Sequence, residues 1–319
     1  MRVLVTGGAG FIGSHLTDAL IARGDQVTVV DDLSAGRIGR VHKNADFHIQ
    51  DITGARQFAA LVEMVRPALI CHLAAQIDVR ASVTFPATDS KVNVTGTVNV
   101  LEAALAVGAR VLFSSTGGAI YGRGVPIPSP ETAQTMPESP YGTAKYCAEQ
   151  YIGLFNRLHG TNHGILRFAN VYGPRQDPAG EGGVVGIFCS RAFAGKPLTI
   201  FGDGAQTRDF VYVADVVDAI LAAAECQKPG VWNIGTGTEM SVRSLASLVG
   251  EVSGRVTDPE FAPARPGELD RSALSAELAA LELGWRPATM LTDGVAAVYR
   301  WIEAGALDRI GTEGTALLW

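Results

Sequence analysis

The first half of the chain alternates short apolar, β-branched runs with longer segments of helical periodicity. The short runs predict five strands, at residues 3–5, 26–30, 46–49, 68–71 and 110–113. Apolar residues recur at helical spacing between them, at about 12–23, 54–66 and 85–107. Nearly continuous apolar strands separated by helices are typical of parallel strands covered on both faces. The pattern therefore predicts an α/β protein with a Rossmann-type, doubly wound parallel sheet.

The second half of the chain has a different character. Glycine and proline become frequent from about residue 169, and the predicted elements become shorter. Because 209–224 again reads as a strand followed by a helix, we expect the chain to cross between two lobes more than once. Residues 1–168 are expected to form the larger domain, with a return segment near 209–232. Residues 169–319 should form mainly a smaller α/β lobe that binds the substrate.

A glycine-rich segment joins the first predicted strand to the first predicted helix. It reads VTGGAGFIG over residues 5–13 and fits the spacing G-x-G-x-x-G. Such glycines allow a tight turn and let the backbone approach a pyrophosphate at a helix amino terminus. Asp31 ends the second strand, where a carboxylate can accept hydrogen bonds from an adenosine ribose. A 2′-phosphate there would face a like charge, so the larger domain is predicted to bind NAD rather than NADP.

Tyr141 and Lys145 stand four residues apart and would share one face of a helix. A tyrosine with a pKa near 10 is a poor base, but a neighbouring ammonium and the positive nicotinamide both favour its phenolate. Ser114, Ser115 and Thr116 end the fifth strand, at the edge where open parallel sheets bind ligands. One of these hydroxyls could bridge a substrate oxygen and Tyr141. The plainer alternatives are an amphipathic helix and a polar turn at a strand end.

These motifs together resemble the extended short-chain dehydrogenase/reductase superfamily, and within it the UDP-sugar 4-epimerases related to UDP-glucose 4-epimerase. The resemblance covers nearly the whole chain. Besides the segments above, it is carried by HLAA at 72–75, NVTGT at 93–97, LRFANVYGP at 166–174, FGDGAQTRDFV at 201–211 and RPGE at 265–268.

The resemblance implies a set of NAD-binding residues at the ends of successive strands. They are Gly7, Gly10, Phe11, Ile12, Gly13, Asp31, Asp32, Asp51, Ile52, Leu73, Ala74, Ala75, Asn93, Ser114, Tyr141, Lys145 and Phe168. Asp51 would contact the adenine, or else only cap a helix. His72 is expected to be a structural histidine at a strand end rather than a catalyst.

A second set is implied to hold the UDP-sugar: Asn170, Val185, Phe201, Arg208, Arg265, Glu268 and Ser272. The amide and the two guanidiniums suit the diphosphate, because arginine forks onto phosphate oxygens. The phenylalanine would lie against the uracil and the glutamate would accept from the uridine ribose. The alternatives are an ion pair of Arg208 with Asp209, a surface charge at Arg265, and plain core at Phe201.

The resemblance also implies the reaction, which is NAD-dependent C4 epimerisation of a UDP-hexose (UDP-glucose or UDP-galactose) through a transient 4-keto sugar. Tyr141 would take the proton of the 4-hydroxyl, with Thr116, or less favourably Ser115, in the relay. Hydride would pass to NAD and return to the other face after the sugar rotates. The segment 116–122 is one residue longer than the family pattern, so the catalytic hydroxyl is not uniquely aligned.

Neighbouring functions are disfavoured by single residues. The related 4,6-dehydratases carry Asp-Glu where this chain has Gly117 and Gly118. A net reductase would consume NADPH, which the carboxylate of Asp31 opposes. A non-catalytic dinucleotide sensor would be expected to lose Tyr141 or Lys145, and both are present.

Two other sugars remain as alternatives. UDP-glucuronate 4-epimerases often have a basic residue where Asp177 stands, and a carboxylate there would repel the sugar carboxylate, so a neutral hexose is preferred. Arg80, Arg175 or Arg191 could still supply a positive charge. A small residue at Ser272, where larger side chains exclude N-acetyl groups, suggests that UDP-N-acetylhexosamines might fit as well.

Composition narrows the class of protein further. The 319 residues include 26 Lys and Arg against 32 Asp and Glu, and this net charge of −6 gives no basic footprint for nucleic acid or an anionic membrane. The four cysteines are far apart, which suggests neither a zinc site nor a disulfide framework. No signal segment and no apolar run of bilayer length is recognisable. We expect a cytoplasmic enzyme that, as the resemblance implies, dimerises through helices near 85–107 and 141–159.

Overall fold

A seven-stranded parallel sheet forms the centre of the protein, whose computed structural model describes residues 1–177, 183–255, 259–264 and 269–305. The strand order is β11-β6-β5-β4-β1-β2-β3. The strands are β1 (Arg2–Thr6), β2 (Gln26–Asp31), β3 (Asp46–Ile49), β4 (Leu69–His72), β5 (Arg110–Thr116), β6 (Gly164–Phe168) and β11 (Gly230–Ile234). The order reverses at β1 and β4, which places a ligand crevice at the carboxyl ends of these strands. The predicted doubly wound fold is confirmed.

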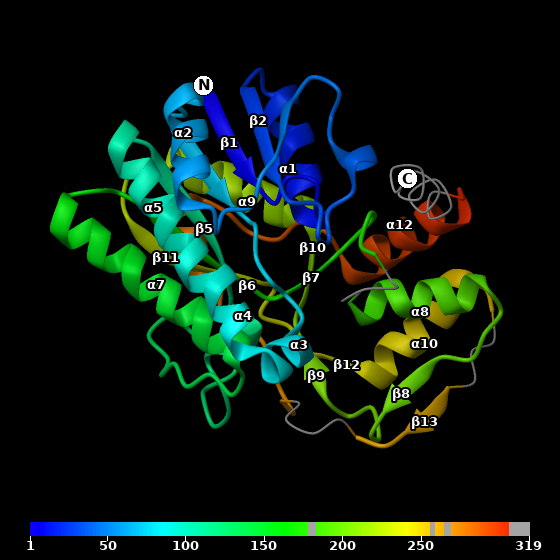
Figure 1. The fold of residues 1–319 in the computed structure, drawn as a ribbon. Helices are drawn as coiled ribbons and strands as arrows, with labels where there is room; N and C mark the ends of the chain where they lie inside the picture. The colour runs from blue at the N-terminus through cyan, green and yellow to red at the C-terminus, as the bar shows by residue number, and fades with distance from the viewer. Residues whose placement is uncertain (178–182, 256–258, 265–268, 306–319) are drawn as a thin grey trace.

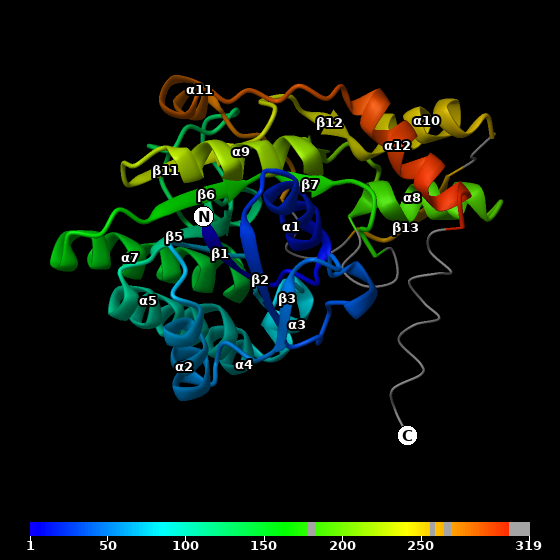
Figure 2. The same ribbon diagram turned by 90° about the horizontal axis from the view of Figure 1, so that it is seen from above.

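Helices cover both faces of this sheet, as Figures 1 and 2 show. One face packs against α1 (Phe11–Ala22), α9 (Val213–Glu225) and α11 (Glu277–Leu283). The other packs against α2 (Ala55–Val65), α5 (Gly96–Val107) and α7 (Pro140–His159). Side chains alternate between the faces of a strand, so Val3 and Val5 enter the first core and Leu4 the second.

The helical stretch predicted at about 85–107 is observed as a continuous helical segment over residues 86–107, interrupted by one π-helical turn. It consists of α4 (Pro86–Ser90), a π-helical turn η2 (Lys91–Thr95) and α5, and a short α3 (Val79–Thr84) precedes it. Phe85 leaves the helical region, with φ −130° and ψ 62°, because a residue that precedes proline is sterically excluded from it.

The smaller lobe lies beside the carboxyl edge of the sheet (Figure 1). Its core is formed by α8 (Val184–Phe193), α10 (Val242–Ser253) and α12 (Leu291–Glu303). Three two-stranded sheets complete it: β7 (Asn170–Tyr172) with β10 (Phe210–Tyr212), β9 (Thr207–Arg208) with β12 (Met240–Ser241), and β8 (Thr199–Phe201) with β13 (Glu260–Ala262). The chain crosses between the lobes repeatedly, since α9, β11 and α11 all return to the larger core.

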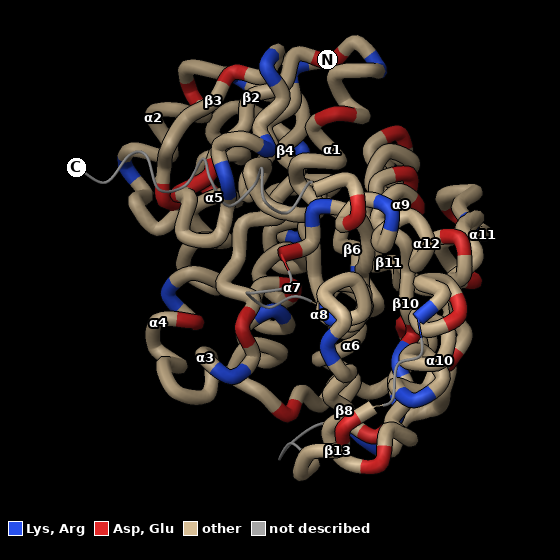
Figure 3. The backbone as a smooth tube through the Cα atoms, turned by 90° about the vertical axis from the view of Figure 1, so that its right-hand side faces the viewer, with Lys and Arg blue, Asp and Glu red and all other residues tan. Residues whose placement is uncertain are grey.

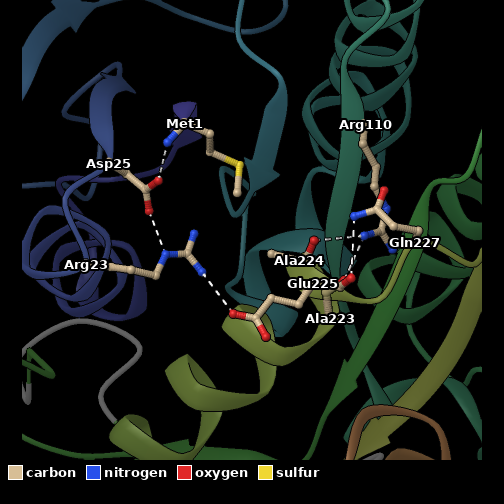
Figure 4. A network of polar contacts seen from close by, with 8 residues as sticks. All are labelled: Met1, Arg23, Asp25, Arg110, Ala223, Ala224, Glu225 and Gln227. Carbon is tan, nitrogen blue, oxygen red and sulfur yellow. Dashed lines mark hydrogen bonds and ion pairs between the residues drawn. The ribbon is translucent and has the colours of Figure 1, made fainter.

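Charged side chains form two sets of polar contacts at the amino-terminal edge of the sheet, as seen in Figure 4. Arg110 opens β5 and is only 7% exposed, and its Nη1 donates to the carbonyl oxygen of Ala223 at 2.7 Å. This oxygen belongs to the last turn of α9, where carbonyls lack helical partners and a cation is favourable. Nearby, Asp25 accepts from the amino terminus at 2.6 Å and from Arg23 at 2.7 Å.

Acidic and basic residues are interspersed over the side of the molecule drawn in Figure 3. Within the described ranges, no helix is both long and apolar enough to cross a bilayer. The same residues contain no group of three or more His, Cys, Asp or Glu side chains suited to a metal ion.

Candidate active site

The glycine segment forms a tight cradle between β1 and α1. Gly7 adopts φ +72°, in the left-handed region that favours glycine, and its N–H donates to Val30 O at 2.8 Å. A Cβ on Gly13 would overlap the carbonyl oxygen of Gly7, so the helix can approach the loop only without a side chain there. Gly10 is the N-cap of α1, and the first-turn N–H groups that follow have no intrahelical partners. The cradle fits a pyrophosphate.

Asp31 lies beside this cradle, at the end of β2. The residue is 6% exposed, and its two oxygens accept from Ala9 N at 3.0 Å and Leu33 N at 2.9 Å. Burial raises the pKa of the carboxyl group, and these amide donors act against that rise. Each oxygen keeps a second lone pair, which a ribose hydroxyl can use. The residues present therefore fit NAD.

The other predicted cofactor residues have different local roles. Leu73, Ala74 and Ala75 follow β4, and Ser114 and Phe168 lie at or near the ends of β5 and β6, so all five lie at the carboxyl edge of the sheet. Phe11 and Ile12 begin α1.

Three more predicted cofactor residues shape turns or fill the core. Asp51 accepts from Thr53 N at 2.7 Å, which closes a turn rather than capping a helix. Asp32 accepts from Ser34 N at 2.9 Å in the same way. Ile52 is buried, and its side chain occupies the space where a Cβ on Gly96 would lie.

Asn93 and His72 hold backbone segments in place. The buried Asn93 amide donates to Gln76 O at 2.9 Å and accepts from Gln76 N at 3.0 Å, which fixes the segment after β4. His72 lies between the hydroxyls of Thr6 (2.8 Å) and Thr97 (3.0 Å). Burial lowers the pKa of His72 to about 3, so this histidine is neutral and structural, as predicted.

The helix α7 carries Tyr141 and Lys145 one turn apart. Pro140 occupies its first turn, and the Ser139 hydroxyl caps it by accepting from Gly142 N at 3.1 Å. Lys145 is 3% exposed, and its Nζ donates to Ser114 O at 3.0 Å. Burial lowers the pKa of Lys145 to about 8. The ammonium is therefore fixed near the end of β5, and the half-buried Tyr141 lies one helical turn earlier on α7.

The two candidate hydroxyls point to opposite sides of β5. Ser115 is buried, and its Oγ has no hydrogen-bond partner among the residues that the structure describes. Thr116 is half-buried and begins α6 (Gly117–Ile120). A Cβ built on Gly118 would lie 3.9 Å from Thr116 Oγ1 and 3.6 Å from Asn170 Oδ1. Thr116 and Asn170 thus flank one small region beside Gly118.

Gly117 packs closely against a residue far away in the sequence, a contact that sequence reasoning missed. A Cβ on Gly117 would overlap the side chain of Leu274, which fills that space. Leu274 N in turn donates to Asp209 Oδ2 at 3.1 Å. Asp209 also accepts from Thr236 N at 2.9 Å, so this buried carboxylate is anchored on backbone amides. The only sequence signal was the glycine itself.

The predicted substrate residues lie along the smaller lobe. Asn170 is exposed at the start of β7, while Phe201, Arg208 and Ser272 are half-buried. Arg208 Nη1 donates to Thr207 O at 2.7 Å. Val185 is fully buried in the lobe core. Arg265 and Glu268 fall outside the described residues.

Asp177 forms an ion pair with Arg37 of the larger domain. This partner neutralises the carboxylate. The expectation that Asp177 repels a sugar carboxylate therefore loses its physical basis.

Comparisons with known proteins agree with this geometry. Residues 3–235 match the model of the NAD dependent epimerase/dehydratase family. UDP-glucose 4-epimerase of Mycolicibacterium smegmatis is 45% identical over 303 residues, which cover 93% of this chain and 96% of that protein. The crystal structure of UDP-glucose 4-epimerase with UDP-glucose from Thermotoga maritima is 45% identical, has a TM-score of 0.94, and aligns over 96% of this chain and 100% of that one. The Thermus thermophilus UDP-glucose 4-epimerase complex with NAD is 40% identical, with a TM-score of 0.90 and coverage of 95% and 99%.

Proposed function

We propose that this chain, which belongs to the NAD dependent epimerase/dehydratase family, interconverts UDP-glucose and UDP-galactose by epimerisation at C4. The observation that carries this proposal is that buried Lys145 donates to Ser114 O of β5, two residues before Thr116, on the same sheet edge as the glycine cradle. The names of the relatives support the sugar, and the Thermus thermophilus complex supports NAD.

The residues of the chain perform the acid–base part of the reaction. Bound NAD supplies reversible hydride acceptance. Tyr141 removes the proton of the sugar 4-hydroxyl and later returns it, and the Lys145 ammonium stabilises its phenolate. Thr116 relays the proton between the sugar oxygen and Tyr141. Asn170 and Arg208 hold the diphosphate, so that UDP is bound firmly while the hexose stays free to turn.

The function is tested by supplying the purified protein with UDP-glucose, UDP-glucuronate and UDP-N-acetylglucosamine in separate reactions without added cofactor. Chromatography then resolves the C4 epimers. We expect UDP-galactose from UDP-glucose. Product from only the glucuronate or only the N-acetylhexosamine would refute the substrate assignment, and no product from any of the three would refute the function.

Replacing Thr116 by Val should lower kcat by about 10²-fold, because the isosteric side chain cannot relay a proton. The matched variant Ser115→Ala should retain kcat within about threefold, since the Ser115 hydroxyl is buried away from the crevice. Steady-state kinetics with UDP-glucose measure both. The reverse ranking of the two variants would assign the relay to Ser115.

The chain is further proposed to form a homodimer through α5 and α7. Tyr151, Leu154 and Leu158 form an exposed stripe at helical spacing on α7, and Leu105 is exposed on α5. Leu158→Glu should therefore shift the molecular mass measured by light scattering from dimer to monomer. The control Leu281→Glu changes a leucine of α11 that is 83% exposed and should leave the dimer intact. A wild-type monomer would refute the proposal.

A further inference from the structure

A buried ion pair lies one helical turn beyond Lys145. Glu149 of α7 accepts from Arg167 of β6, with 2.6 Å from Nη2 to Oε2 and 3.0 Å from Nε to Oε1. The side chains are only 2% and 7% exposed. Removing two charges from water is costly, and apolar residues of similar size often stabilise a fold equally well. A gain in folding stability is therefore a weak explanation for the presence of this buried ion pair.

Arg167 also contacts the turn that follows Thr116. Its Nη1 donates to the Tyr121 hydroxyl at 2.8 Å, and its guanidinium lies 5.2 Å from the centre of the Tyr121 ring. The Tyr121 hydroxyl donates in turn to Asn233 Oδ1 at 2.8 Å. Tyr121 directly follows α6, whose N-cap is Thr116. One guanidinium thus joins the helix of Tyr141 and Lys145 to the turn of Thr116.

The charges around Lys145 come from few groups. Asp89 of α4 and Glu149 of α7 both raise the pKa of Lys145, against the burial that lowers it to about 8. His72 of β4 is neutral because its own pKa lies near 3. Tyr141 stands one turn earlier on α7, and Phe113 of β5 offers only its ring face, 4.7 Å from Nζ. Among the residues that the structure describes, Glu149 is therefore one of two carboxylates whose charge favours the ammonium.

We propose that Glu149 and Arg167 are positioning residues for the reaction: the pair fixes the Tyr141–Lys145 helix against the Thr116 turn, and Glu149 maintains the positive charge beside Tyr141. The link to catalysis rests on the proposed function. The effect on the ionisation of Tyr141 does not, because it can be measured without any sugar.

Glu149→Gln tests the charge. The amide keeps the size of the side chain and can still accept from Arg167, but the negative charge is lost. The pKa of Lys145 should then fall, and the alkaline limb of the kcat/KM profile should move to lower pH by about one unit. The phenolate absorbance of Tyr141, obtained by subtracting the Tyr141→Phe spectrum, should appear at higher pH. In this variant Lys145 has lost its proton in a fraction of the molecules, and those molecules lack the charge that stabilises the phenolate.

Two further variants separate charge from geometry. Glu149→Asp keeps the charge but shortens the side chain, so kcat should fall about tenfold while the alkaline limb stays in place. Glu63→Gln alters an exposed carboxylate of α2 and should change neither measurement.

Several outcomes would overturn the inference. If Glu149→Gln lowers only the melting temperature while both pH readouts stay unmoved, the pair is merely structural. If that variant does not fold, an unchanged kcat in Glu149→Asp would have the same meaning. A wild-type protein inactive on every UDP-sugar would instead refute the proposed function, while the phenolate titration would still decide the role of Glu149.

Discussion

Tyr141→Phe is expected to lower the kcat of epimerisation by about 10³-fold, because it removes the group proposed to act as the base for the sugar 4-hydroxyl. Phenylalanine keeps the ring and its packing, so the helix α7 and the bond from Lys145 to Ser114 should persist. The affinity for UDP, measured by calorimetry, should therefore stay within about twofold. Such a result shows the loss of a step rather than of binding.

The matched control is Tyr299→Phe, which removes a phenol from α12 in the smaller lobe. This variant should keep the wild-type kcat. Retained epimerisation in Tyr141→Phe would exclude Tyr141 as the base. Loss of UDP affinity in the same variant would show that the phenol serves binding instead.

The larger domain could be predicted because its signals are local. Apolar runs and the turn residues between them placed five strands of the sheet within a few residues of their observed bounds. The glycine segment was equally clear, since the need for φ > 0 at Gly7 and for close packing at Gly13 can be met by few other residues. The short helix α3 before Phe85 and the π-helical turn at Lys91–Thr95 were not predicted, because neither changes the apolar periodicity of the segment at 85–107.

Ser115 and Thr116 can be told apart only when the residue at which β5 ends is known. The apolar run stops at residue 113, but the strand continues to Thr116. Alternation along that extension sends Ser115 into the protein and Thr116 toward the crevice. The sequence pattern could not show this, because polar residues at a strand end read equally well as a turn.

Contacts between residues far apart in the sequence could not be predicted from the local pattern of apolar and polar residues. Arg167 and Glu149 come from different elements, and no local spacing pairs them. Gly117 and Leu274 are far apart in the sequence, so Gly117 was considered only as the place where a dehydratase would have an acidic residue. Asp177 was likewise considered only as a charge that would repel a sugar carboxylate, although it pairs with Arg37. Tertiary structure alone decides such partners.

Gly13→Ala should disable the cofactor site even though alanine favours a helix by about 1 kcal/mol over glycine. The new Cβ would overlap the carbonyl oxygen of Gly7 and crowd the backbone of Gly8, neither of which can rotate away as a side chain tip would. Overpacking of this kind costs about 1–3 kcal/mol. If moving the cradle relieves that strain, NAD affinity should fall by up to about 100-fold, since each factor of ten corresponds to about 1.4 kcal/mol. Calorimetric titration of the cofactor-free protein measures it.

Gly153→Ala is the matched control, because it makes the same substitution within α7. There the nearest atom to the new Cβ is the flexible end of Arg157, at 3.4 Å. Helix propensity should then prevail and raise the free energy of unfolding by about 0.5–1 kcal/mol, with NAD affinity unchanged. Opposite signs for one substitution at two helical glycines would show that Gly13 is required by the backbone it touches. Wild-type NAD affinity in Gly13→Ala would mean that the dinucleotide does not depend on this cradle.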